Sequence, residues 1–251
     1  MSVKARIQSF LRSATGYELT RINKKETDPL LQFFAMLRRW NFEPKTIYDV
    51  GANRGGWTRS AVKYFPEASY VLVEPQDHLK INLQDLLDRG FKLEWINAGA
   101  GESPGIFPFS IAGRDDSSSF ARGFAGSEGS PQVLQIEVKT LNQIAADRGG
   151  EMPELVKIDA EGWDLHVLKG ASDLIGVTDI FLIEAAICAK GFENTYLEVV
   201  QTFDRIGYDL IDITCLNRSP ENDTLWLVEL AFLRRGHALL SHATRYDSFT
   251  F

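Results

Sequence analysis

The segment IYDVGANRGGWTRSAV (47–62) joins a strand-like run to a helix-like run through a turn that contains three glycines. Glycines let the backbone turn sharply at this point and let a ligand approach the chain with no Cβ in the way. The order is Asp-x-Gly-x-x-x-Gly, beginning at Asp49 at the end of the strand, and it lacks the Gly-x-Gly-x-x-Gly spacing of a dinucleotide fingerprint. A carboxylate there suits a ligand with an ammonium group or hydroxyls, such as S-adenosylmethionine, and disfavours a pyrophosphate.

A second carboxylate ends the next strand-like run, in YVLVEP (70–75). Glu74 lies 25 positions after Asp49, and we expect its carboxylate to be exposed at the strand tip, where it can accept both hydroxyls of a ribose. The alternative is a purely architectural glycine-rich turn with an incidental surface glutamate. The strand context on both sides of the turn favours a cofactor site, and the residues expected to bind the cofactor here are Asp49, Gly51, Asn53, Gly55, Gly56 and Glu74.

Strand-like runs alternate with helix-like patterns from Lys45 onward. The predicted strands are TIYDV (46–50), SYVLVE (69–74), KLEWIN (92–97), LVKIDA (155–160), DIFLIE (179–184), YDLIDI (208–213) and LWLVELAFLRR (225–235), and the helical patterns lie around 57–65, 77–89, 163–175 and 194–206. Strands that are apolar on both faces and separated by helices are typical of a parallel sheet covered on both sides. We therefore predict one doubly wound α/β domain over residues 45–251, with a mostly parallel seven-stranded sheet that ends in an antiparallel hairpin.

Two segments are predicted to be additions to this domain. Residues 1–44 are expected to form a helical extension, because Asp28 and Pro29 make a good helix start and apolar residues then recur at helical spacing as far as Trp40. Between the third and fourth parallel strands lie IFPFSIA (106–112), a Ser/Gly-rich stretch (113–131) and VLQIEV (133–138), which we interpret as an antiparallel hairpin with a long loop. A solvated loop is the default interpretation of a Ser/Gly run, but its length favours a segment that closes over a ligand.

Three further carboxylates fall at the carboxyl edge of the predicted sheet, where ligands of doubly wound folds bind. Asp159 ends the fourth parallel strand, where a carboxylate is costly unless it has a partner or reaches a ligand. Glu161 begins the following helix and is equally well explained as a helix cap. Glu184 ends the fifth strand in an apolar setting, either as a general base with a raised pKa or as a buried glutamate paired with Lys157 or Lys190. We predict that all three line a reaction centre. Asp159 and Glu184 could share a divalent metal ion, but their spacing does not require one, and we predict none.

The composition limits the class of protein and of partner. The 251 residues carry 27 Lys and Arg against 34 Asp and Glu, and the net charge of −7 argues against a nucleic-acid-binding surface. Two cysteines without a C-x-x-C spacing are typical of a reducing compartment. The apolar run at 180–189 is too short to span a bilayer, and the first residues lack a signal-peptide core. We expect a cytoplasmic protein.

Several of these segments resemble the FkbM-type S-adenosylmethionine-dependent methyltransferases. They are IYDVGANRGGWT (47–58), VLVEP (71–75), NAGAGESPGIFPFS (97–110), VKTLNQIA (138–145), VKIDAEGWDLHVLKGA (156–171) and FLIEAA (181–186). The similarity runs from about Pro44 to Arg234, and its most specific piece is KIDAEGWDLHVLKGA (157–171). The resemblance implies a class I methyltransferase (Rossmann-like) fold, S-adenosylmethionine as cofactor and, usually, methylation of a hydroxyl on a sugar or natural product.

The resemblance also implies further site residues. By their place in the family's segments, Asn97, Ala98, Ser118 and Asp159 are expected to contact the cofactor. Asn142 and Glu229 stand where the family more often has Asp, and these departures bear on substrate choice more than on cofactor binding.

Two rival functions are weighed against this one. A cofactor-binding module that has lost catalysis and acts through partners would share the fold, although acidic residues at every relevant strand tip argue against it. An NAD-dependent oxidoreductase is disfavoured because the dinucleotide fingerprint is missing. Phe249 and Phe251 could dock on the same chain or on a neighbour, so the oligomeric state stays open.

Overall fold

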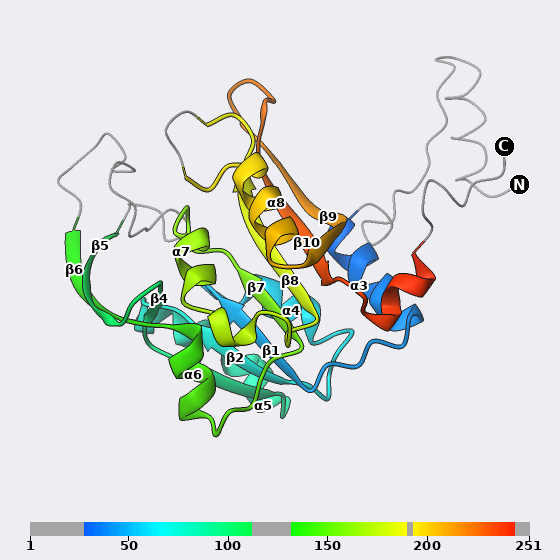
Figure 1. The fold of residues 1–251 in the computed structure, drawn as a ribbon. Helices are drawn as coiled ribbons and strands as arrows, with labels where there is room; N and C mark the ends of the chain where they lie inside the picture. Colours follow the sequence, from blue (N-terminus) through cyan, green and yellow to red (C-terminus); the bar gives the residue numbers. More distant parts are fainter. Residues whose placement is uncertain (1–27, 112–131, 190–192, 244–251) are drawn as a thin grey trace, which may run out of the picture.

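A seven-stranded sheet with the strand order β3-β2-β1-β7-β8-β10-β9 forms the centre of the protein (Figure 1). The computed structural model describes residues 28–111, 132–189 and 193–243. The strands of this sheet are β1 (Thr46–Val50), β2 (Ser69–Val73), β3 (Lys92–Ile96), β7 (Leu155–Ile158), β8 (Ile180–Ala186), β9 (Tyr208–Arg218) and β10 (Leu225–Arg234). The first five in sheet order are parallel, and β10 is antiparallel to both of its neighbours. The class I methyltransferase (Rossmann-like) architecture with an antiparallel C-terminal hairpin is thus confirmed.

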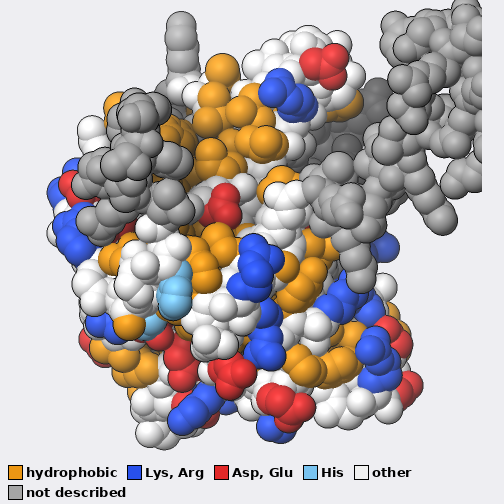
Figure 2. Space-filling view, turned by 90° about the vertical axis from the view of Figure 1, so that its right-hand side faces the viewer, with side chains coloured by type: hydrophobic (Ala, Val, Ile, Leu, Met, Phe, Trp, Pro, Cys, Tyr) orange, Lys and Arg blue, Asp and Glu red, His pale blue; other side chains and the backbone are white. Residues whose placement is uncertain are grey.

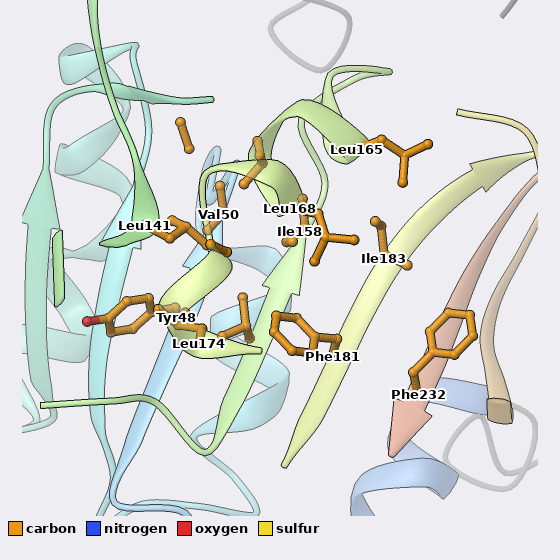
Figure 3. Close-up of a cluster of buried hydrophobic side chains, with 14 of the residues drawn as sticks. Tyr48, Val50, Leu141, Ile158, Leu165, Leu168, Leu174, Phe181, Ile183 and Phe232 are labelled. Atoms are coloured by element: carbon orange, nitrogen blue, oxygen red, sulfur yellow. The ribbon is translucent and has the colours of Figure 1, made fainter. Parts of the chain in front are cut away.

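Helices cover both faces of this sheet. One face packs against α6 (Leu141–Asp147), α7 (Asp164–Lys169) and α8 (Tyr196–Arg205), and the other packs against α3 (Pro29–Arg39), α4 (Gly56–Ala61) and α5 (Gln84–Asp88). Figure 3 shows the first of these cores, which contains Leu141 of α6, Leu165 of α7 and Phe181 of β8. Burial on both faces explains why the strands are continuously apolar. No helix in the described ranges has both the length and the apolar composition needed to cross a membrane.

A smaller sheet stands beside the main one. β5 (Gly105–Ile111) and β6 (Gln132–Lys139) pair antiparallel, and the two-residue β4 (Gly99–Ala100) pairs parallel with β6. Figure 1 shows the β5–β6 ribbon extending away from the main sheet. The predicted antiparallel hairpin is confirmed, and the Ser/Gly-rich stretch between its strands lies outside the described residues.

The helix over 29–39 begins as the sequence predicts. The side chain of Asp28 accepts hydrogen bonds from the backbone N–H groups of Leu30 (3.0 Å) and Leu31 (3.3 Å), and Pro29 occupies the first turn. Phe33 and Phe34 from this helix are completely buried in the same core as β1 and β2.

The other helices differ in detail from the sequence pattern. The 77–89 segment is a 3-10 helix, η1 (Asp77–Leu83), followed by α5. The 163–175 segment divides into α7 and the 3-10 turn η3 (Ser172–Leu174), because Gly170 packs directly on the backbone after β4. An ideal Cβ at Gly170 would lie 2.0 Å from the carbonyl oxygen of Gly101. Helix α6 was not expected, although Thr140 and Gln143 form the capping box that signals its start.

The strand β9 lies at the edge of the main sheet and carries exposed apolar side chains. Leu210, Ile213 and Leu216 of β9 and Trp226 of β10 are each more than a third exposed. Figure 2, which views the side of the molecule where β9 and α3 lie, shows hydrophobic side chains gathered on this face. Register irregularities interrupt the pairing of β9 with β10, as is common at sheet edges.

The glycine-rich turn after β1 packs against the turn after β7. Gly51 has φ of +73°, and an ideal Cβ there would lie 1.8 Å from the carbonyl oxygen of Asp159. We expected a glycine here to make room for a ligand. The structure adds a second reason: a side chain at position 51 would collide with the backbone of Asp159.

We expect Gly51→Ala to cost much more stability than Gly90→Ala. Both glycines have positive φ, but a Cβ at Gly90 meets nothing within 4 Å. The left-handed conformation should cost about 1–2 kcal/mol in each variant, and the backbone clash should add roughly 1–3 kcal/mol in Gly51→Ala. Urea denaturation of the two variants measures the difference, and equal losses would show that the backbone contact is not limiting.

Candidate active site

Glu74 holds together the turns that follow β1 and β2. Its Oε2 accepts a hydrogen bond from the backbone N–H of Asn53 (2.8 Å), and its Oε1 accepts one from the backbone N–H of Gln76 (3.0 Å). Glu74 is 4% exposed, and burial raises the pKa of its carboxyl against the opposing effect of these hydrogen bonds. The expectation of an exposed carboxylate is wrong, because both turns fold over it. Oε1 also accepts a hydrogen bond from the Gln76 side-chain amide (3.4 Å), so Oε2 is the oxygen that keeps a lone pair for a further donor.

A cavity of about 140 Å³ lies beside Glu74 at the carboxyl edge of the sheet. Its walls come from the turns after β1, β2 and β7, from β4 and from Phe109 of β5. The predicted site residues that line it are Gly51, Asn53, Glu74, Ala98, Asp159 and Glu161. The structure thus brings together, in one hollow, residues from four segments that are far apart in the sequence.

Other predicted site residues lie near the cavity without lining it. Among the described residues these are Asp49, Gly55, Gly56, Asn97 and Glu184. The Asn97 side-chain amide donates to the backbone oxygens of Glu74 (3.3 Å) and Pro75 (3.0 Å), so it holds the turn after β2 in place. Ser118 lies outside the described residues.

A larger cavity of about 620 Å³ lies between α7 and α8. Its walls include Leu165, Leu168 and Ile206, and none of the predicted site residues is among the described residues that line it. Because doubly wound folds bind their ligands at the carboxyl edge of the sheet, we assign the site to the smaller cavity.

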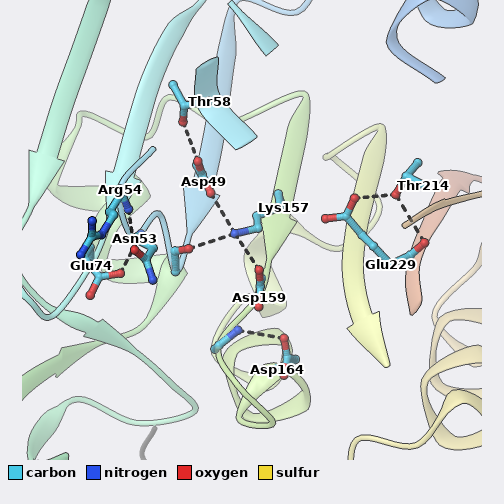
Figure 4. A network of polar contacts seen from close by, with 12 residues as sticks. Asp49, Asn53, Arg54, Thr58, Glu74, Lys157, Asp159, Asp164, Thr214 and Glu229 are labelled. Atoms are coloured by element: carbon cyan, nitrogen blue, oxygen red, sulfur yellow. Dashed lines mark hydrogen bonds and ion pairs between the residues drawn. The ribbon is translucent and has the colours of Figure 1, made fainter. Parts of the chain in front are cut away.

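The ammonium group of Lys157 lies where the carboxyl ends of the neighbouring strands β1 and β7 meet. It donates a hydrogen bond to the carbonyl oxygen of Gly51 (2.9 Å) and forms ion pairs with Asp49 Oδ1 (3.2 Å) and Asp159 Oδ2 (3.3 Å) (Figure 4). Burial by itself lowers the pKa of Lys157, but the charges of Asp159, Asp49 and Glu229 outweigh that effect and raise it. The sequence suggests this lysine as a partner of Glu184, whereas its ion pairs in the described residues are with Asp49 and Asp159.

Lys157 changes the interpretation of Asp49. Asp49 is completely buried, and its second oxygen accepts a hydrogen bond from the Thr58 hydroxyl (2.5 Å). A cation for this carboxylate comes from the protein itself, so the sequence-based argument that Asp49 awaits a ligand's ammonium group is not needed. Asp159, whose side chain is 36% exposed, is the carboxylate partner of Lys157 that reaches the cavity.

Glu184, which is half-buried, lies beside the buried Glu229. β8 continues to Ala186, so Glu184 stands within the strand rather than at its end, directly opposite Glu229 of β10. Burial raises the pKa of Glu184 well above its ordinary value, and the charges of Asp159, Asp164 and Glu161 add to the effect. The Thr214 hydroxyl donates to Glu229 (2.5 Å), and burial raises the pKa of Glu229 to about 7.

Glu161 does not cap the helix that follows it. α7 begins at Asp164, whose Oδ1 and Oδ2 accept hydrogen bonds from the backbone N–H groups of Ala160 (2.9 Å) and Gly162 (3.0 Å). Glu161 itself stands in the left-handed region, with φ of +51°, and borders the cavity. The capping alternative is therefore wrong, because the helix starts later than the pattern suggested.

The described residues contain no group of three or more His, Cys, Asp or Glu side chains placed to hold a metal ion.

Comparisons with known proteins identify one family. The sequence profile described as "Methyltransferase FkbM domain" matches residues 49–210. A search of curated protein sequences gave no significant match.

Three solved structures are reported as similar. An rRNA methylase from Streptococcus thermophilus has 11% identity, covers 87% of this chain and 99% of its own, and gives a TM-score of 0.49. A putative O-methyltransferase from Klebsiella pneumoniae has 13% identity, coverage of 94% and 91%, and a TM-score of 0.46. The 1,6-didemethyltoxoflavin-N1-methyltransferase of Burkholderia thailandensis, solved with S-adenosylhomocysteine, has 12% identity, coverage of 94% and 92%, and a TM-score of 0.42.

Removal of the buried cation should destabilise the protein strongly. Lys157→Met leaves Asp49 buried without its ion pair, and we expect a loss of about 3–5 kcal/mol in the free energy of unfolding. Lys169→Met is the matched control, because Lys169 is 54% exposed and its ion pair with Glu102 should contribute less than about 1 kcal/mol. Urea denaturation compares the two, and similar small losses would contradict a central role for Lys157.

Glu229 should give the stability a measurable pH dependence. Its pKa rises from 4.5 to about 7 on folding, so its contribution is complete below about pH 4.5 and is lost as the pH rises through about 7. Relative to the wild type, Glu229→Gln should therefore gain about 2–3 kcal/mol between about pH 5 and pH 8. The exposed Glu221→Gln on the same hairpin serves as control. Parallel pH profiles for wild type and Glu229→Gln would rule out the raised pKa.

Proposed function

The chain belongs to the FkbM methyltransferase family, and from this premise we propose that it transfers a methyl group from S-adenosylmethionine to a hydroxyl oxygen of a small molecule or glycoside. The observation that carries the proposal is the cavity at the carboxyl edge, which Glu74 borders from the β2 side and Asp159 from the β7 side. The family match supports S-adenosylmethionine as the cofactor.

Glu74 is suited to hold the ribose of this cofactor. Its two oxygens are oriented by donors from Asn53 and Gln76: Oε2 can accept one ribose hydroxyl directly, and Oε1 can accept the other once the weaker bond from the Gln76 side-chain amide (3.4 Å) is released. Whole small-molecule sites typically enclose about 300–1,000 Å³, so a cavity of about 140 Å³ fits the ribose portion, and the rest of the cofactor extends beyond it. Gly51, Asn53 and Ala98 supply the adjoining walls.

The acidic side of the site is suited to a positively charged cofactor. S-adenosylmethionine supplies its methyl group from a sulfonium that carries a positive charge. Asp159 lines the cavity, and in the described part of the chain its ion-pair partner is Lys157, a cation that Asp49 shares. We therefore assign Asp159 to the methionine end of the cofactor or to the orientation of the acceptor.

The chemical step asks the protein mainly for alignment and exclusion of water. Asp159 and Glu161 border the cavity, and Glu184 stands next to them on β8. With its raised pKa, Glu184 holds a proton at neutral pH in the cofactor-free protein. A positive charge nearby lowers that pKa, so Glu184 becomes able to accept the hydroxyl proton of an acceptor once the cofactor is bound.

The class of acceptor and the compartment are part of the proposal. The net charge of −7 and the carboxylates around the cavity support an uncharged or glycoside acceptor over a nucleic acid. Cys188 and Cys215 are both free, which supports a reducing, cytoplasmic location.

Isothermal titration of the protein with S-adenosylmethionine, S-adenosylhomocysteine and NAD tests the cofactor. We expect micromolar binding of the two adenosyl ligands and none of NAD. Glu74→Gln should weaken both at least tenfold, because an amide loses one of the oriented acceptors, or roughly 1.4 kcal/mol. Glu67→Gln, an exposed glutamate before β2, should bind normally.

The outcomes separate the candidate functions. Unchanged affinity in folded Glu74→Gln would overturn the ribose assignment, and failure of the wild type to bind either adenosyl ligand would overturn the cofactor. Binding without methyl transfer to any of a panel of glycosides and hydroxylated metabolites would favour the rival module that has lost catalysis.

A further inference from the structure

Two buried polar residues connect the turn after β7 with the segment after β8. Asp164 begins α7 and is 0% exposed, and Asn194 precedes α8 and is 2% exposed. Neither is among the residues that line the cofactor cavity. Their burial is costly unless their hydrogen bonds are made, so their contacts show what they hold.

Asp164 shapes the turn that carries the site carboxylates. Its hydrogen bonds from the N–H groups of Ala160 and Gly162 enclose Glu161, which is held at φ +51°. A residue other than glycine in this conformation costs about 1–2 kcal/mol, which the surrounding contacts must offset. The carboxylate of Asp164 therefore determines the path of the chain between Asp159 and α7.

Asn194 extends this arrangement to β8. Its side-chain amide donates both to Asp164 Oδ2 (3.0 Å) and to the carbonyl oxygen of Glu184 (2.7 Å). The backbone carbonyl oxygen of Asn194 accepts a hydrogen bond from the backbone N–H of Ala186 (2.9 Å). One amide group thus joins the turn that carries Asp159 and Glu161 to the strand position that carries Glu184.

We propose that Asp164 and Asn194 are positioning residues, which set the placement of Asp159 and Glu161 relative to Glu184 through this buried hydrogen-bonded bridge. The proposal rests on the proposed function, because it takes those three carboxylates as the polar groups of the cofactor and reaction site. Burial and the charge of Asp159 raise the pKa of Asp164 to about 7, so the protein retains a carboxyl group here at an electrostatic cost.

Two substitutions break the bridge at different points. In Asp164→Asn an NH₂ group replaces one carboxylate oxygen and so faces a backbone or side-chain donor, which in the wild type meets an oxygen. Asn194→Ser removes the link to Glu184 and leaves Asp164 and its turn in place. Gln84→Ser is the matched control, because the Gln84 amide also donates to a carboxylate, Asp88 Oδ1 (2.8 Å), but on the surface.

The first measurement is the affinity for S-adenosylmethionine at a temperature where every variant is fully folded. We expect at least tenfold weaker binding for Asp164→Asn, severalfold weaker binding for Asn194→Ser and no change for Gln84→Ser. The double variant should bind no more weakly than about the worse single one, because both changes act through one bridge.

The second measurement is hydrogen exchange of the Ala160 and Gly162 amides in the cofactor-free protein. We expect exchange at least tenfold faster in Asp164→Asn. A merely structural pair would lower the free energy of unfolding and leave the affinity of the folded variants unchanged, and that result overturns the proposal. If Asp164→Asn does not fold, Asn194→Ser decides in the same way. Failure of the wild type to bind S-adenosylmethionine would instead overturn the proposed function.

Discussion

The site depends on the buried ammonium group of Lys157, which lies at the carboxyl ends of the neighbouring strands β1 and β7. Lys157 reaches from β7 to the carbonyl oxygen of Gly51 and to the carboxylates of Asp49 and Asp159. A buried cation is tolerated only when its partners are in place, and the same is true of a completely buried Asp49. The contact therefore fixes the carboxyl ends of β1 and β7 relative to each other, and the glycine-rich turn and the Asp159 turn both start from those ends.

The positive charge of Lys157 does not balance all of the carboxyl groups around it. Glu184 and Glu229 stand opposite each other on β8 and β10, and Lys157 lowers the pKa of each by less than burial raises it. Carboxyl groups in this situation hold their protons to a higher pH than usual, and a further positive charge nearby favours their ionised form. This is the electrostatic reason for expecting a cationic cofactor, and it explains why the site suits a sulfonium better than a pyrophosphate.

Much of the fold and part of the site could be predicted from the sequence. Six of the seven strands of the main sheet were placed to within two residues at each end, because apolar runs buried on both faces are regular signals. The edge strand β9 continues five residues beyond the predicted 208–213, since its outer half is exposed and lacks that signal. The glycine-rich turn, Glu74 and Asp159 were found because each ends a strand, and the topology brings such ends to one edge. Helix α6 was missed even though its capping box is visible at Thr140 and Gln143, since a seven-residue helix has little periodicity.

The sequence by itself determined the order of the main-sheet strands along the chain, the family and the edge of the sheet to which we assign the site, because these follow from periodicity and short local motifs. Only the tertiary structure decided what each polar side chain contacts. It showed that Asp49 is neutralised by Lys157 and that Glu74 is buried. It also showed that Gly51 is required by the backbone of Asp159, and that Asp164 and Asn194 join two connections that are 30 residues apart. These contacts join segments distant along the chain, so no local pattern encodes them.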